Sequence, residues 1–127
     1  MGEPLQYIIG EWDFCGESFK VGSGVLIPRA DTETLIERAC SLLSGEKELT
    51  VIDLCSGSGC IGITLEKKLD CKEVWCVEKS EAAMYFLKEN AARLNSACKP
   101  LLGDVTDESL PEKLPLADLI ISNPPYI

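Results

Sequence analysis

Residues 50–62 read Thr-Val-Ile-Asp-Leu-Cys-Ser-Gly-Ser-Gly-Cys-Ile-Gly, and this stretch decides the fold. Its first five residues are mostly apolar and rich in β-branched side chains, which is typical of a buried strand in a parallel sheet. The glycines at 57 and 59 predict a tight turn in which the backbone can approach a ligand closely. A helix follows, and free N–H groups at its start would face that ligand. The stretch therefore predicts a strand–turn–helix unit that binds a ligand.

The same turn is compatible with more than one cofactor. Gly57, Gly59 and Gly62 spell the dinucleotide fingerprint, and Glu78 follows about twenty positions later, where a ribose-binding carboxylate belongs. Asp53, however, would repel a pyrophosphate on this turn and would suit a ligand with a cationic amino-acid end. A buried carboxylate is also costly unless it is used or hydrogen-bonded. We therefore favour S-adenosylmethionine over NAD, with a tight turn that binds no ligand as the plain structural alternative.

The composition limits the class of protein. The chain has 127 residues, enough for one domain with a buried core, and carries a formal charge of −9 with pI ≈ 4.5. Such a chain lacks the basic field that recruits phosphates, so unassisted nucleic-acid binding is disfavoured. No apolar run is long enough to span a membrane, and the start lacks the features of a signal peptide.

The cysteines predict a reducing environment and no metal. There are seven cysteines and no histidine, and no two cysteines form a Cys-x-x-Cys pair. The spacing of a zinc site is therefore absent. We expect reduced cysteines that act as small apolar core residues in a cytoplasmic protein.

The segment before the central strand predicts an N-terminal extension over residues 4–29. Within it, residues 10–25 look like a β-hairpin, with Gly16-Glu17-Ser18 as the turn. A helix is then expected to start with Asp31 or Thr32 as its cap and to end at Gly45. Three nearby charges fit either capping and surface roles or a functional role: Arg29, Asp31 and Glu33.

After the central strand, helices and strands alternate. We expect helices at 60–69 and after a Ser80 cap, strands at 73–78, 99–102 and 117–122, and a solvated loop at 106–116. The inward face of the helix after Ser80 is expected to consist of Ala83, Phe86, Leu87, Ala91 and Leu94.

This alternation predicts an α/β, doubly wound, Rossmann-like domain with a parallel sheet flanked by helices. The chain reads as a single domain over 1–127, with the core at 31–127. Four groups of residues directly follow strands: 55–59, 78, 104–105 and 123–126. They are expected to meet at the carboxyl edge of the sheet, where such folds bind ligands.

The last strand is followed by Asn123-Pro124-Pro125-Tyr126, which is more specific than the glycine turn. Neither proline has an N–H and both restrict φ, so the turn is stiff and its carbonyls are free to point into a pocket. Asn123 offers a side-chain carbonyl acceptor. Two rigid acceptors beside a cofactor suit a planar NH2 group, against which Tyr126 could pack. The plain alternative is a Pro-Pro stop with a core tyrosine.

Residues 53–59 together with 123–126 resemble the class I S-adenosylmethionine-dependent amino-methyltransferases. Two further stretches, 4–10 and 25–33, narrow the resemblance to the HemK/PrmC family of peptide chain release factor N5-glutamine methyltransferases. The resemblance covers nearly the whole chain. The N-terminal helical domain and the later strands of that family are absent, so the sequence looks like a fragment of the catalytic domain.

The resemblance implies a site made of three parts. Cys55 to Gly59 would wrap the methionine end of S-adenosylmethionine, Glu78 would take the ribose hydroxyls, and Asp104 and Val105 would lie by the adenine. The implied cofactor-binding residues are Asp53, Cys55, Ser56, Gly57, Ser58, Gly59, Glu78, Asp104, Val105 and Asn123. The implied catalytic residues are Asn123, Pro124 and Tyr126, and the substrate-binding residues are Asn123, Pro124, Pro125 and Tyr126. Two residues depart from the commoner pattern, which has glycine at Cys55 and aspartate at Glu78.

The implied partner is a release factor, whose Gly-Gly-Gln glutamine would be methylated, with neither a nucleic acid nor a membrane as a direct partner. A nucleic-acid amino-methyltransferase of the adenine-N6 type is a second candidate, because an exocyclic amine presents similar hydrogens to the same motif. A non-catalytic nucleotide-binding module is a third. Weak self-association is also expected, because the last strand, 119–121, is apolar and lacks later neighbours in this sequence.

Overall fold

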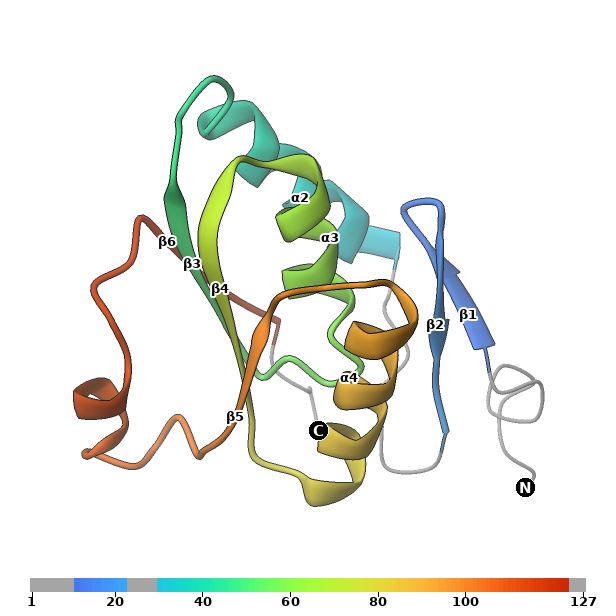
Figure 1. Ribbon diagram of the computed structural model, residues 1–127, viewed down its shortest axis with the longest axis vertical. Helices are drawn as coiled ribbons and strands as arrows, with labels where there is room; N and C mark the ends of the chain where they lie inside the picture. Colours follow the sequence, from blue (N-terminus) through green and yellow to red (C-terminus); the bar gives the residue numbers. More distant parts are fainter. Residues whose placement is uncertain (1–10, 23–29, 124–127) are drawn as a thin grey trace.

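The computed structural model describes residues 11–22 and 30–123. A four-stranded parallel sheet forms its centre, in the order β5-β4-β3-β6 (Figure 1). The strands are β3 (Leu49–Leu54), β4 (Cys71–Glu78), β5 (Lys99–Leu102) and β6 (Leu119–Ser122). The four predicted strands are present, but the last one, expected over 117–122, begins only at Leu119. The pairing of β3 with β4 starts at Leu49 and Cys71, which places both starts slightly earlier than the apolar pattern suggested.

Three helices cover one face of the sheet: α2 (Ala30–Leu42), α3 (Cys60–Lys68) and α4 (Glu81–Arg93) (Figure 1). The chain moves in one direction through β3, β4 and β5, so right-handed crossovers put α3 and α4 on the same side. The predicted cap of α4 is confirmed, since Ser80 Oγ accepts a hydrogen bond from Ala83 N at 3.2 Å.

A short 3-10 helix, η1 (Leu110–Lys113), and its flanking loop pack against the other face. We predicted a solvated loop over 106–116, and this was wrong for residues 110–114, where η1 forms and Leu114 packs, partly buried, against the cluster that contains Leu110. Leu110 is buried and packs in a cluster with Ile52 and Val77. Burial of one leucine shields the apolar side chains on this face of β3 and β4 from water.

The inward face of α4 was predicted only in part. Ala83 and Leu87 are buried as expected, whereas Phe86 is half-buried and packs beside Val21, next to the hairpin. Ala91 and Leu94 are also only partly buried, and the buried positions that we missed are Met84 and Asn90. The helix therefore contacts two surfaces, the sheet and the hairpin, and a pattern that assumes one apolar face cannot separate them.

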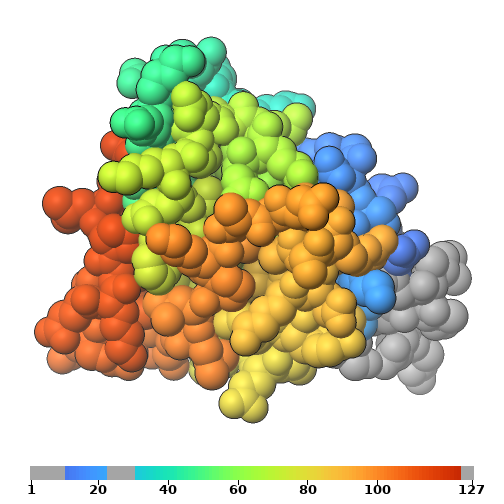
Figure 2. Space-filling model, in the orientation of Figure 1, coloured from blue at the N-terminus to red at the C-terminus, as the bar shows by residue number. Residues whose placement is uncertain are grey.

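The N-terminal hairpin consists of β1 (Glu11–Phe14) and β2 (Glu17–Lys20) and lies beside α4, where its blue surface adjoins the helix in Figure 2. The predicted Gly16-Glu17-Ser18 turn was wrong: Phe14 pairs with Glu17, so the turn is Cys15-Gly16. Both turn residues have positive φ, 49° and 83°, as a two-residue hairpin turn of the type I′ class requires.

Several predictions concern residues outside the described ranges. These are the apolar start at 4–9, the extended segment at 25–29, and Pro124, Pro125 and Tyr126. The division into an extension and a core also stays a prediction. Within residues 11–22 and 30–123, no helix is long and apolar enough to cross a membrane.

Candidate functional site

The strand register places the predicted site residues in a row. Leu54 pairs with Ser122 on one side and with Val77 on the other, and Glu78 pairs with Leu102. The segments that follow these strands therefore line the carboxyl edge in the order 103–105, 78–80, 55–59 and 123. The predicted convergence on this edge is confirmed as far as residue 123.

The side chains of the turn face the protein. Ser56 N donates to Val77 O at 2.9 Å, and Ser56 Oγ donates to the backbone oxygen of Asp53 at 2.9 Å. Ser56 and Ser58 are only 6% and 1% exposed. Their part in a cofactor site is therefore to shape the turn, and a ligand would meet its backbone.

Glycine is needed at each of the three fingerprint positions for a different physical reason. An added Cβ at Gly59 would lie 2.5 Å from Leu87 Cδ1, and one at Gly62 would lie 2.5 Å from Cys76 Sγ. Gly59 therefore allows the start of α3 to lie close to α4, and Gly62 allows α3 to lie close to β4. Gly57 has φ +58° and open space where a Cβ would stand, so its backbone is accessible to a ligand.

Cys55 adopts a conformation that glycine accepts more readily. Its φ is 61°, in the left-handed region that side chains disfavour. The residue is half-buried, and this burial raises the pKa of the thiol above its usual value. The departure from glycine at this position therefore keeps the glycine-like backbone.

Glu78 joins the turn to the start of α4. Its Oε1 accepts from Gly57 N at 2.8 Å, and its Oε2 accepts from Ser80 N at 2.8 Å. We expected the N–H groups of the turn to face a ligand, but this one points to the carboxylate. A carboxylate has about four acceptor positions, so each oxygen keeps one for a ligand hydroxyl.

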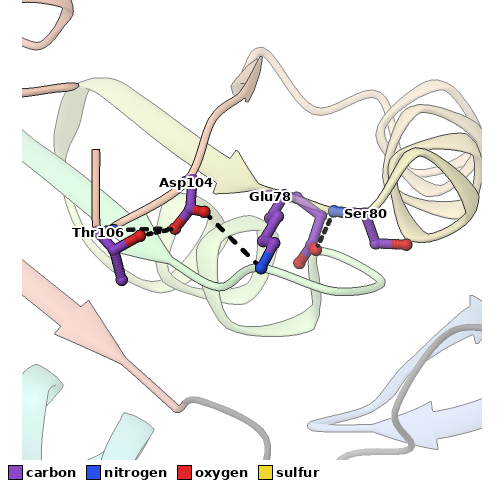
Figure 3. Close-up of polar contacts among 5 residues, drawn as sticks. Glu78, Ser80, Asp104 and Thr106 are labelled. Carbon is purple, nitrogen blue, oxygen red and sulfur yellow. Dashed lines mark hydrogen bonds and ion pairs between the residues drawn. The ribbon is translucent and has the colours of Figure 1, made fainter. Parts of the chain in front are cut away.

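Asp104 lies beside Glu78 at the edge, as Figure 3 shows. Its Oδ1 accepts from Thr106 N at 2.9 Å and from Thr106 Oγ1 at 2.7 Å, and its Oδ2 lies 3.7 Å from Lys79 Nζ. The bonds from Thr106, and then Lys79, lower the pKa of Asp104. Next to it, Val105 is 46% exposed and offers apolar surface to a flat ring.

Asp53 is placed differently from our expectation. It is fully buried under α3, and its Oδ2 accepts from Gly62 N at 3.0 Å, which caps the helix because Gly59 has no side chain to do so. Among the described residues, its Oδ1 has no hydrogen-bond partner. Burial raises the pKa of this carboxyl to about 7, although the Ser56 hydroxyl and the Gly62 amide oppose the shift. In this arrangement the side chain supports the turn from below and presents no surface to a ligand.

Asn123 ends the row and contacts the first turn of α2. Its Nδ2 donates to Thr32 Oγ1 at 2.9 Å. Thr32 is only 2% exposed, whereas Asp31 and Glu33 on either side are exposed. The contact joins residues 91 positions apart. Of the four residues in the closing motif, Asn123 alone lies within the described ranges.

Sequence reasoning missed two polar residues near the site, Thr32 in this role and Asn90. Asn90 is fully buried, and its amide nitrogen donates to Ser58 O at 2.9 Å and to Lys20 O at 3.0 Å. A polar residue on the inward face of a helix was the available signal. All seven cysteines are free, and the described residues contain no cluster of His, Cys, Asp or Glu that could hold a metal ion.

Comparison with known proteins gives a consistent result. The family model of the methyltransferase small domain matches residues 14–127. A release factor glutamine methyltransferase from Koribacter versatilis is 40% identical over 126 residues, which cover 99% of this chain and 44% of that protein. One from Geobacter sulfurreducens is 41% identical over 125 residues, covering 98% of this chain and 42% of that protein. The chain thus spans less than half the length of these relatives.

A solved structure supports the same fold. The Thermus thermophilus 16S rRNA N2 G1207 methyltransferase, in complex with AdoMet and guanosine, is 26% identical with a TM-score of 0.71. The match covers 92% of this chain and 32% of that one. These findings confirm the class I methyltransferase fold and the resemblance that the motifs indicated. Since the family model matches almost the whole chain, the chain belongs to the methyltransferase small domain family.

Proposed function

We propose that the chain binds S-adenosylmethionine along the carboxyl edge of its sheet and transfers the methyl group to the side-chain amide of a glutamine in a Gly-Gly-Gln motif of a peptide chain release factor. The order of groups along this edge carries the proposal. Asp104 and Val105, Glu78, the 55–59 turn and Asn123 follow one another in the register of the four strands. An extended S-adenosylmethionine presents adenine, ribose and methionine in the same order, and the methyl acceptor would follow beyond the methionine.

The residues of the edge fit this cofactor. Both oxygens of Glu78 are held by backbone N–H groups and retain acceptor positions for two neighbouring hydroxyls, as a ribose presents. Gly57 leaves its backbone open beside them. When bound, S-adenosylmethionine supplies a methyl group on a positively charged sulfur, and an acidic edge favours that charge.

Asn123 is the proposed acceptor-binding residue, together with Pro124, Pro125 and Tyr126. An amide nitrogen is a weak nucleophile because its lone pair is delocalised. Asn123 Oδ1 and the Pro124 carbonyl would each accept one hydrogen of the glutamine NH2 and align its nitrogen with the methyl carbon. Tyr126 would pack against the planar amide, and Pro125 would keep the turn stiff. We propose that Asn123 also contacts the bound cofactor.

The step is an in-line displacement. A bond forms between the glutamine nitrogen and the methyl carbon while the carbon–sulfur bond breaks, and the electron pair of that bond stays on sulfur. The nitrogen then releases one proton to solvent. No side chain need act as a strong base, since the proton leaves after transfer. Orientation by fixed hydrogen bonds would supply most of the acceleration.

A nucleic-acid amine is the second candidate acceptor. The similar Thermus thermophilus enzyme is a 16S rRNA N2 G1207 methyltransferase. Against this, the chain has 21 acidic and 12 basic side chains, and a strongly negative protein repels phosphate backbones. The curated relatives at about 40% identity are named for release factor methylation, which favours the protein substrate.

The substrate is tested by methyl transfer from tritiated cofactor to a release factor, to the same factor with the motif glutamine changed to alanine, and to RNA and DNA. The assay uses this chain and a longer chain that contains it. We expect label on the release factor only, and only with the glutamine present. Label on nucleic acid alone would support the second candidate. Cofactor binding measured by calorimetry without transfer to any acceptor would indicate a binding module.

The role of Asn123 is tested by Asn123→Ala. Loss of one aligned polar contact at the reacting centre should lower the transfer rate on the order of 10²–10³-fold, while cofactor affinity stays largely unchanged. Asn95→Gly is a matched control, because Asn95 lies between the end of α4 and the start of β5 and has φ 53°, which glycine accepts. An unchanged rate in Asn123→Ala would remove the acceptor-binding role and the main support for this enzyme.

A further inference from the structure

The contact between Thr32 and Asn123 restricts a side chain that can otherwise turn over. A carboxamide has an oxygen that accepts hydrogen bonds and a nitrogen that donates them, and rotation by half a turn exchanges the two. Here the nitrogen, Nδ2, donates to Thr32 Oγ1 at 2.9 Å. Oδ1 therefore lies on the side of the carboxamide away from Thr32.

The hydroxyl is well placed to hold the carboxamide at the end of β6, where it accepts from Nδ2. Thr32 is 2% exposed, so water has little access to take over the hydrogen bond. The helix that carries it is fixed by Ile36 and Ala39, which are 1% and 5% exposed and belong to the main core. Thr34, two positions later, is exposed. The first turn of α2 thus directs one hydroxyl inward, to the end of β6.

We propose that Thr32 is a positioning residue that orients the Asn123 carboxamide with Oδ1 available to the methyl acceptor. This rests on the proposed function of Asn123. A glutamine amide presents two hydrogens and needs an acceptor opposite them. With the carboxamide reversed, two N–H groups would face each other, and the acceptor nitrogen would not be aligned. Thr32 acts through Asn123 and touches neither cofactor nor acceptor.

The orientation itself is tested without any substrate. Nuclear magnetic resonance of the ¹⁵N-labelled chain resolves the side-chain NH2 of Asn123, assigned by its loss in Asn123→Ala. In Thr32→Val, which keeps the shape and removes the hydroxyl, the Asn123 NH2 signals should shift and exchange faster with water. Thr34→Val, an exposed change on the same turn, should leave them in place. Unchanged Asn123 signals in Thr32→Val would overturn the proposal, whether or not the chain methylates a release factor.

The consequence for transfer is tested by a double-mutant cycle on the acceptor that the wild type methylates. Thr32→Val should lower kcat about fivefold to tenfold, the factor that corresponds to one neutral hydrogen bond, with cofactor Kd unchanged. Thr32→Ser should restore kcat, because serine keeps the hydroxyl. Adding Thr32→Val to Asn123→Ala should cause no further loss, since Thr32 acts only through Asn123.

Full additivity of the two changes, or a loss of cofactor affinity equal to the loss of kcat, would show that Thr32 merely supports the fold and would overturn the proposal. Melting curves of each variant establish that it folds, and Thr32→Ala takes the place of Thr32→Val if the valine variant does not. A wild type that methylates no release factor counts against the proposed function alone, because the resonance experiment still decides the orientation.

Discussion

Glu78 has two tasks, one inside the protein and one toward a ligand. Its carboxylate accepts from Gly57 N and Ser80 N, each at 2.8 Å, and so ties the turn after β3 to the start of α4. The remaining acceptor positions are proposed to bind ribose hydroxyls. A residue with both tasks makes the shape of the turn and the affinity for cofactor depend on each other.

Glu78→Ala should weaken S-adenosylmethionine binding by about 1.5–3 kcal/mol, the range for lost hydrogen bonds to a charged group. The affinity is measured by calorimetry. Glu81→Ala is the matched control, since it removes the same charge from an exposed position at the start of the same helix and should change the affinity little. Equal affinities for the wild type and a folded Glu78→Ala variant would exclude the ribose role.

Asp53 makes the stability of the chain depend on pH. Burial raises its pKa to about 7 from 3.8, so between these values the folded chain keeps a proton that the unfolded chain releases. The stabilisation from the neutral carboxyl is fully present below about pH 4 and is lost as the pH rises through about 7. This sign is opposite to that of Asp104 and Asp107, whose pKa values are lowered.

Comparison with Asp53→Asn isolates this effect. Asparagine keeps an oxygen for Gly62 N and carries no charge at any pH. Between pH 4 and pH 8, the free energy of unfolding of the wild type should fall relative to the variant by about 4 kcal/mol, at about 1.4 kcal/mol for each unit of pKa shift. Urea denaturation at several pH values measures it. A difference that does not change with pH would show that the carboxyl titrates normally.

At the scale of elements, the Asn90 side chain links α4 to β2 and to the turn after β3. It lies on α4, its Nδ2 donates to Ser58 O in the turn and to Lys20 O in β2, and its Oδ1 accepts from Lys20 N at 2.6 Å. The residue is fully buried. The position of the hairpin and the shape of the turn therefore depend on one side chain.

Asn90→Ala should lower the free energy of unfolding by about 1–3 kcal/mol, because it leaves buried backbone groups without partners. Hydrogen exchange should show faster exchange of the Lys20 amide, whose acceptor is lost. Lys88→Ala, an exposed change on the same helix, serves as the control. Wild-type protection of Lys20 in the variant would mean that strand pairing alone holds the hairpin in place.

At the scale of the whole molecule, the side of β6 that faces away from β3 favours self-association. Within the described residues β6 pairs with β3 alone, Ile120 on it is 62% exposed, and Leu116 just before it is 98% exposed. An apolar strand with unpaired backbone groups invites pairing with another chain. The charge of −9 opposes association and is screened by salt.

We therefore predict weak self-association of the 127-residue chain at millimolar concentration, stronger at high salt. Sedimentation analysis measures it. Ile120→Lys should abolish it, because a charge on an edge strand disfavours pairing, whereas Leu42→Lys, at an exposed position on α2, should not. A monomer at all concentrations and salt levels would contradict this prediction.

The order of elements could be read from the sequence, because strand and helix periods and caps are local properties. Residues 50–62 predicted β3, the turn and α3, and Ser80 predicted the start of α4. The carboxyl-edge position of Glu78, Asp104 and Asn123 followed from the rule that parallel strands end at one edge. The resemblance of the glycine turn and the closing motif then led to the family.

Only the tertiary structure decided what each side chain touches. Asp53 was expected to face a ligand and is buried under α3, and Thr32 and Asn90 were not singled out for the contacts they make. These contacts join residues 32 and 91 positions apart, whose distance in space depends on the packing of α2 and α4. Local sequence patterns determine which face of an element is buried. Which polar group meets which depends on how the elements pack, and that is settled by the whole core at once.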